Sequence, residues 1–125
     1  MGPRSTSAVV IVAHGSRAED ANIAHLQLCE AVAARTGRTV YPAFLEIATP
    51  DVAAAIAAAV SAGHHHISVL PHFLAPGNHT SRDIPELINA ARLEHPAVEL
   101  EVLPHTGADP NLVALVADAV ATRPD

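Results

Sequence analysis

The segment Val9-Val10-Ile11-Val12-Ala13-His14-Gly15-Ser16 joins a short apolar run to a polar turn. A β-branched run of this length, followed by Gly and Ser, is typical of a strand that ends in a loop. We therefore predict a strand over residues 8–13, with His14 directly after its carboxyl end. Ligands of open parallel sheets bind beyond the carboxyl ends of the strands, so His14 is a candidate site residue.

The rest of the chain alternates similar apolar runs with Ala-rich segments. Further strands are predicted over residues 39–44, 67–70 and 98–103, the last with the alternation of an edge strand that has one wet face. Helices are predicted over residues 18–35 before Gly37, from Thr49-Pro50-Asp51 to near Gly63, from the capping-box pair Asp83 and Glu86 to before Pro96, and from Asp109-Pro110 to before Pro124. Four strand–helix units predict one α/β domain over residues 1–125, with a flavodoxin-like four-stranded parallel sheet, helices on both faces and strand order 2-1-3-4.

Composition excludes several partners. The 125 residues suit one domain and carry a formal net charge of −6, with seven Arg and no Lys. This balance argues against a nucleic-acid surface, and no basic amphipathic stretch or long apolar run suggests a membrane. The single cysteine, Cys29, cannot form an internal disulfide and is expected to be a small buried hydrophobe. We expect a cytoplasmic protein.

Histidine or glutamate follows each predicted strand: His14, then Glu46, then His72 with His79, then His105. The carboxyl ends of parallel strands share one edge of the sheet, so these side chains are expected along one rim. Imidazole and carboxylate together suit divalent Fe, Co, Ni or Zn. Ligands from separate loops are typical of weak, reversible binding, which fits metal delivery better than storage.

The other histidines are expected away from this rim. His64-His65-His66 precedes the third strand, so it is predicted to be a solvated turn at the opposite end of the sheet. His25 and His95 are predicted to be helix-surface or helix-end residues.

Ordered motifs point to a family. They are His14-Gly15-Ser16-Arg17, Ala43-Phe44-Leu45-Glu46, Pro71-His72-Phe73-Leu74, Pro76-Gly77-Asn78-His79 and Asp83-Ile84-Pro85. This set, over roughly residues 8–120, resembles the small sirohydrochlorin chelatases, the single-domain members of the class II tetrapyrrole chelatases. The sequence departs from the family pattern at His72, where an apolar residue is frequent, and at Asp109, which replaces a histidine.

The resemblance implies a lyase that inserts Co²⁺, Fe²⁺ or Ni²⁺ into sirohydrochlorin, toward cobalamin or siroheme, with no cofactor beyond the metal substrate. It implies that His14 and His79 bind the metal or accept pyrrole protons, and that Glu46 is a further base or ligand. Whether Glu46, His72 or His105 joins the first coordination shell stays open. A flat macrocycle needs a second wall, and the larger chelatases contain two such halves, so the resemblance implies a homodimer.

Nearby residues have predicted supporting roles. Arg17 and, more weakly, Arg82 are candidates for pairing with substrate carboxylates, since guanidinium binds carboxylate in a bidentate manner. Ser16 is expected to cap the first helix, although it remains a candidate substrate contact along with His72. Gly15 and Gly77 are expected to permit backbone conformations that other residues resist.

Three other functions fit parts of the sequence. A non-catalytic metal or tetrapyrrole carrier on the same fold is the main alternative. An α/β-hydrolase is disfavoured because the chain has no GxSxG segment. A histidine phosphatase is disfavoured because Ala13, rather than Arg, precedes His14-Gly15.

Overall fold

The structure is a computed structural model that describes residues 7–75 and 77–124, with the backbone alone for residues 78–80. The strands are β1 (Ser7–Ala13), β2 (Thr39–Phe44), β3 (His66–Pro71) and β4 (Glu99–Val102). The helices are α1 (Glu19–Thr36), α2 (Val52–Ser61), α3 (Asn78–Glu94), the short 3-10 helix η2 (Thr106–Ala108) and α4 (Asn111–Ala121).

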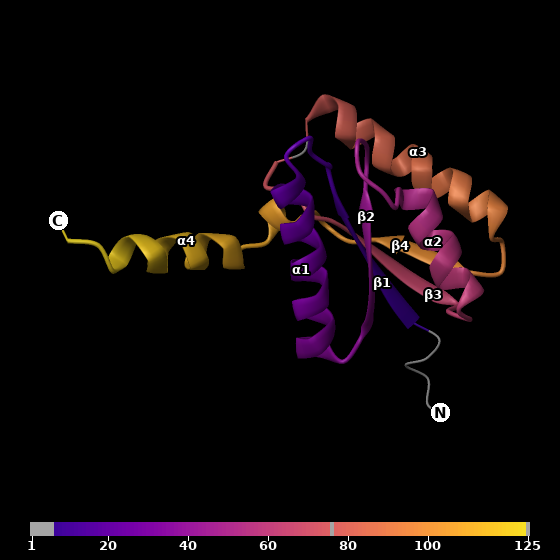
Figure 1. The fold of residues 1–125 in the computed structure, drawn as a ribbon, viewed down its shortest axis with the longest axis horizontal. Coiled ribbons are helices and arrows are strands. Elements are labelled where there is room, and N and C mark those ends of the chain that lie inside the picture. The colour runs from indigo at the N-terminus through magenta and orange to yellow at the C-terminus, as the bar shows by residue number, and fades with distance from the viewer. Residues whose placement is uncertain (1–6, 76, 125) are drawn as a thin grey trace.

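The four strands form one parallel sheet in the order β2-β1-β3-β4, which confirms the predicted fold and strand order. The main apolar core lies between one face of the sheet and helices α2 and α3, and includes Val10, Val12, Ile56, Ile67 and Ile88. α1 lies on the other face, next to β2 (Figure 1). β4 is an edge strand, as predicted, in which Leu100 is buried while Glu99 and Glu101 are exposed.

The buried side of α1 is polar, which was not predicted from the sequence. Asn22, His25 and Cys29 are buried at helical spacing. The prediction of a surface His25 was wrong: its Nε2–H donates to the carbonyl of Ile11, 3.0 Å away, so burial leaves that nitrogen satisfied. The prediction of a buried Cys29 is confirmed, and burial raises the pKa of its thiol to about 11.

Several element boundaries differ from the prediction. α3 begins at Asn78 rather than at the Asp83–Glu86 pair, so the capping-box spacing falls inside the helix, and Pro85 with its fixed φ lies within it as well. α2 is capped by Asp51, whose carboxylate accepts from the N–H of Ala54 at 2.8 Å, and not by Thr49. β4 is shorter than predicted, and η2 was not predicted.

The expectations for the remaining histidines were met in part. His64, His65 and His66 lie at the amino end of β3, away from the predicted rim, as expected. His64 is buried rather than solvated, because its ring packs edge-on to Tyr41 at a centroid distance of 6.0 Å. His95 ends α3, as predicted.

Candidate functional site at the carboxyl edge of the sheet

Hydrogen bonds continue beyond the strand ends and bring the following loops together. The N–H of Leu45 donates to the carbonyl of Ala13 at 2.9 Å, and the N–H of Glu46 donates to that of His14 at 3.1 Å. The N–H of His72 donates to the carbonyl of Val12 at 2.7 Å. The carboxyl edge therefore holds His14, Glu46 and His72 on three adjacent loops, as the sequence predicted.

His14 is exposed, and its ring packs on Phe73, with 4.3 Å between ring centroids and 35° between the planes. Phe73 is itself buried in the core, so it gives the imidazole a fixed support. The arrangement leaves ring nitrogens of His14 available to a ligand at the edge. Sequence reasoning missed this role of Phe73, although its place in the Pro71-His72-Phe73-Leu74 motif was a signal.

Gly15 confirms the prediction of a special backbone conformation. Its φ is +92°, and a Cβ atom there would collide with the backbone carbonyl of Glu46. The two loops are thus in direct backbone contact. Gly77 does not need glycine in this way: its φ is −79° and a Cβ would meet nothing within 4 Å, so that prediction was wrong.

The loop after Glu46 contains a strained residue. Ile47 has a φ of +73°, and the N–H of Ala48 donates back to the carbonyl of Glu46 at 2.8 Å, which closes a γ-turn around Ile47. A β-branched residue rarely adopts this conformation. The Ile47 side chain is exposed.

His72 is held by two neighbours that the sequence did not reveal. Its Nδ1 lies 2.9 Å from the Thr106 hydroxyl, and its ring stacks on that of His25 with centroids 6.1 Å apart. Desolvation by burial, and then electrostatic repulsion from His25, lower the pKa of His72. His72 thus faces the protein more than solvent. His105 lies directly before η2 and is half-buried.

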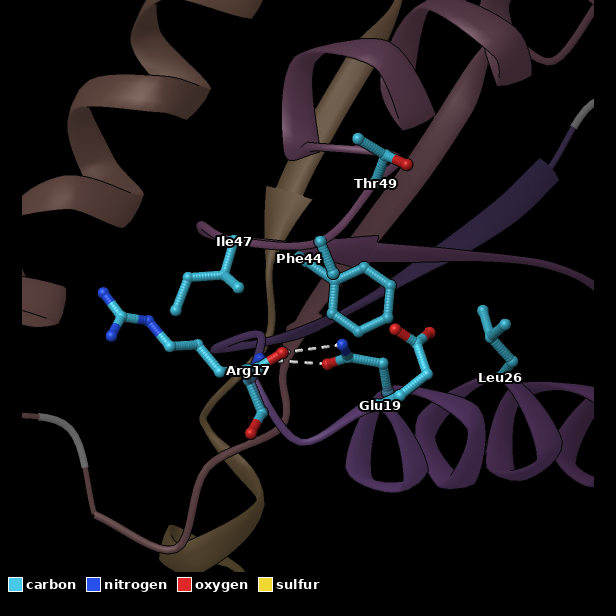
Figure 2. Close-up of a pocket in the computed structure, with 9 residues that line it drawn as sticks. Arg17, Glu19, Leu26, Phe44, Ile47 and Thr49 are labelled. Atoms are coloured by element: carbon cyan, nitrogen blue, oxygen red, sulfur yellow. Dashed lines mark hydrogen bonds between the residues drawn. The ribbon is translucent and has the colours of Figure 1, made fainter.

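A pocket of about 410 Å³ lies beside the edge, between the start of α1 and the loop after β2. Figure 2 shows Arg17 extending beside Ile47, on the side of the pocket away from Leu26. The pocket is lined by Ser16, Arg17, Glu19, Asn22, Leu26, Phe44, Ile47, Ala48 and Thr49. It brings the predicted substrate contacts Ser16 and Arg17 together, although His14, Glu46 and His72 do not line it.

Ser16 does not cap α1 with its side chain. The N-cap is Ala18, and the Ser16 hydroxyl instead accepts from the N–H of Ala18 at 3.0 Å. The side chain of Asn22 is bonded twice to the backbone of Ser16, accepting from its N–H at 2.9 Å and donating to its carbonyl at 2.8 Å. Asn22 therefore fixes the turn that carries Arg17, which is exposed.

The predicted metal ligands are only partly placed. His79 lies in the first turn of α3, and its side chain is outside the described residues, so the predicted His14–His79 pair stays a prediction. Among the side chains that the structure describes, no group of three or more His, Cys, Asp and Glu is placed to hold a metal ion. Arg82 is exposed on α3. No helix in the described part of the chain is long and apolar enough to cross a membrane.

The fold and this edge define a class of protein: a four-stranded parallel α/β unit with an exposed histidine and a glutamate on adjacent loops beyond its strands. The family model of CbiX matches residues 8–123. The chain belongs to the CbiX family.

Similar proteins carry related names. The chain is 30% identical over 113 residues to the chloroplastic sirohydrochlorin ferrochelatase of Arabidopsis thaliana, covering 90% of this chain and 50% of that protein. It is 39% identical over 82 residues to the sirohydrochlorin cobaltochelatase of Methanopyrus kandleri, covering 65% of this chain and 57% of that protein. The chain thus spans about half the length of the curated relatives it matches.

Solved structures share the fold. A CbiX protein of Marinobacter aquaeolei superposes with a TM-score of 0.81 at 26% identity, covering 92% of this chain and 94% of that one. The sirohydrochlorin chelatase SirB of Bacillus subtilis subspecies spizizenii, solved in complex with cobalt, superposes with a TM-score of 0.83 at 28% identity. That match covers 93% of this chain but 50% of SirB.

Proposed function

We propose that this chain is a sirohydrochlorin chelatase that inserts Co²⁺ or Fe²⁺, and by the family resemblance Ni²⁺, into the tetrapyrrole. The observation that carries the proposal is the exposed His14 on its Phe73 support, in backbone contact with the Glu46 loop, in a chain of the CbiX family. Relatives named as sirohydrochlorin cobaltochelatases and ferrochelatases support the choice of metals. The metal is a substrate here, and no other cofactor is part of the proposal.

Insertion requires three tasks: removal of water from the metal, removal of two pyrrole protons, and transfer of the metal to four ring nitrogens. An imidazole can bind a divalent metal or accept a proton. We assign these tasks to His14 and His79, and assign to Glu46 the role of collecting protons beside them. Few protein ligands favour the chemistry, because an ion held tightly by the protein would not leave for the macrocycle.

The Arg17 side of the pocket at the start of α1 suits the acidic arms of the macrocycle, while Glu19 lies on another part of its lining. Its Arg17 is exposed beside the apolar Ile47. Arg17 can therefore bind a carboxylate of the substrate while Ile47 contacts part of the ring face. Ser16 and the first N–H groups of α1 add donors there. The net charge of −6 makes a local cation necessary for an acidic substrate.

A second copy of the chain is part of the proposal. The chain spans about half of SirB and of the Arabidopsis relative. A homodimer supplies the second wall that a flat substrate needs. The cytoplasmic location expected from the sequence stays a prediction.

The test is an insertion assay. Purified protein, sirohydrochlorin and one of Co²⁺, Fe²⁺ or Ni²⁺ are mixed without oxygen, and the change in tetrapyrrole absorbance is followed against the reaction without protein. We expect acceleration that falls about 100-fold in His14→Ala and in His79→Ala, the scale of a lost acid–base group. The control is His65→Ala, exposed near the opposite end of the sheet, which should leave the rate unchanged. Binding of tetrapyrrole without acceleration would replace the proposal with the carrier alternative.

A further inference from the structure

The last helix leaves the rest of the molecule. α4 (Asn111–Ala121) has no buried residue, and Figure 1 shows it projecting away from the sheet and from α1, α2 and α3. Four of its five large apolar side chains, Val113, Leu115, Val116 and Val120, are 54% to 73% exposed, and Leu112 is half-buried. A helix of eleven residues is only marginally stable in water by itself, because most helices in proteins are stabilised by packing an apolar face on a neighbour. In one copy, no residue of α4 is buried by such a neighbour.

Most of the apolar side chains of α4 form one stripe, and Leu115 lies outside it by helical spacing. Leu112, Val113, Val116 and Ala117 line a shallow and almost wholly apolar hollow, and Val120 follows Val116 at helical spacing. Asp118 is the one charged residue of α4 and lies on the other side of the helix by the same spacing. Such a stripe is the face with which a helix packs on a sheet or on another helix.

The direction of α4 is fixed by the segment that precedes it, the 3-10 helix η2. The N–H of Gly107 in η2 donates to the carbonyl of Phe73 at 2.9 Å, and the Thr106 hydroxyl lies 2.9 Å from Nδ1 of His72. Gly107 packs so closely on the backbone of Leu74 that a Cβ would collide with it. The contacts of η2 would be disturbed if α4 folded back on the sheet of its own chain. The sheet of the same chain is therefore a poor packing partner for α4.

The sheet has an uncovered face of matching character. In β3, Ile67 and Val69 face the core with α2 and α3, so Ser68 and Leu70 face the opposite side, where they are half-buried. α1 lies along β2, and the helix packed against β4 is α3, from the core side. On that side of β3, α1 reaches only the end of the strand, where His25 stacks on His72. Elsewhere no described helix packs extensively on this side of β3 and β4, and Leu70 is half-buried there.

We infer that α4 is an exchanged arm: its apolar stripe packs on the uncovered face of β3 and β4 in a second copy, which returns its own α4. Exchange satisfies both unpartnered surfaces with one two-fold contact. The arm starts at η2, beside His72 and His105, so the exchange also joins the second copy to the carboxyl edge. This inference rests on the proposed homodimer and specifies how it is built.

The first test is the molecular mass in solution, measured by light scattering at micromolar concentration. The wild-type chain should show twice 12.9 kDa, and Val116→Lys should halve that mass while the far-ultraviolet circular dichroism spectrum of the body is retained. The matched control is Ala114→Lys, on the other side of α4, which should stay dimeric. A wild-type mass of 12.9 kDa, or a dimeric Val116→Lys, overturns the inference.

The second test separates exchange from folding back. In the double variant Leu70→Cys with Val116→Cys, oxidation should give a covalent dimer on a denaturing gel without reductant. A disulfide within one chain, seen as a monomer band without free thiol at these positions, overturns the exchange. Ala114→Cys with Leu70→Cys is the control and should not cross-link. The native Cys29 adds little background because its thiol is buried.

The outcomes distinguish this inference from the proposed activity. A monomer that accelerates metal insertion refutes the arm exchange and leaves the chelatase assignment in place. A cross-linked dimer that does not accelerate metal insertion supports the arm exchange and refutes the chelatase assignment.

Discussion

Replacing Gly15 by alanine tests how the site is held together. The backbone at Gly15 has a φ of +92°, which costs an L-residue about 1–2 kcal/mol. The added Cβ also collides with the carbonyl of Glu46, and an overpacked contact of this kind costs about 1–3 kcal/mol. Gly15→Ala should therefore lose about 3 kcal/mol of unfolding free energy, a large part of the 5–15 kcal/mol that is typical of small domains.

Gly37 offers a matched control. Its φ is +72° at the end of α1, but a Cβ there would meet nothing within 4 Å. Gly37→Ala should therefore cost only the conformational part, about 1 kcal/mol. Urea unfolding followed by circular dichroism measures both values; a small domain loses about 1–3 kcal/mol per molar urea, so the two midpoints should differ by about 1 M.

The two variants should also differ in function. The collision at Gly15 displaces the Glu46 backbone, and with it the hydrogen bond from Glu46 to His14, whereas Gly37 is distant from the edge. Metal insertion by folded Gly15→Ala should thus fall at least tenfold, and that of Gly37→Ala should stay near wild type. Equal stability losses in the two variants, or full activity in Gly15→Ala, would refute the view that this backbone contact sets the geometry of the site.

Three further measurements address neighbouring features. The pKa of His72 is lowered in the folded protein, so the unfolded chain takes up the proton first as the pH falls. The free energy of unfolding should therefore decrease as the pH drops below the ordinary pKa of histidine. His72→Gln should reduce this dependence of stability on pH, and an unchanged dependence would count against the role of His72. Arg17→Gln should raise the KM for the tetrapyrrole about tenfold with kcat little changed, whereas Arg35→Gln in the last turn of α1 should change neither. The Cys29 thiol, with a pKa of about 11, should react with a thiol reagent at pH 8 only after unfolding by urea, and rapid labelling of the native protein would contradict its burial.

The sheet could be predicted because its signals are local. The β-branched runs before His14 and His72 mark strands by composition, and the handedness of parallel crossovers leaves few strand orders. The position of the edge follows from the same reasoning, since every strand of a parallel sheet ends on one side. Gly15 and Gly37 were identified for the same reason: both lie where a strand or a helix must end in a tight turn.

The support of the edge could not be predicted, because it depends on contacts between distant segments. His25 is polar, so it suggested a surface position, yet the carbonyl of Ile11 satisfies its ring inside the protein. The spacing of Asn22, His25 and Cys29 on one helical face was the signal that was available. The contact from His72 to Thr106 crosses 34 positions of the chain, and no local pattern indicates it.

The way the edge is built favours transfer of a metal over its retention. His14 and Glu46 are brought together by backbone hydrogen bonds and by the glycine contact, and the described side chains form no group of three or more metal-ligating residues around them. Backbone contacts fix where the loops lie without requiring an ion, so the edge keeps its shape before the metal arrives and after it leaves. A structural metal site works in the opposite way, since there the ion itself holds the ligands and is bound tightly. For the proposed insertion reaction, we expect such a preformed edge to let the four ring nitrogens of the substrate take the ion from His14 and its neighbours.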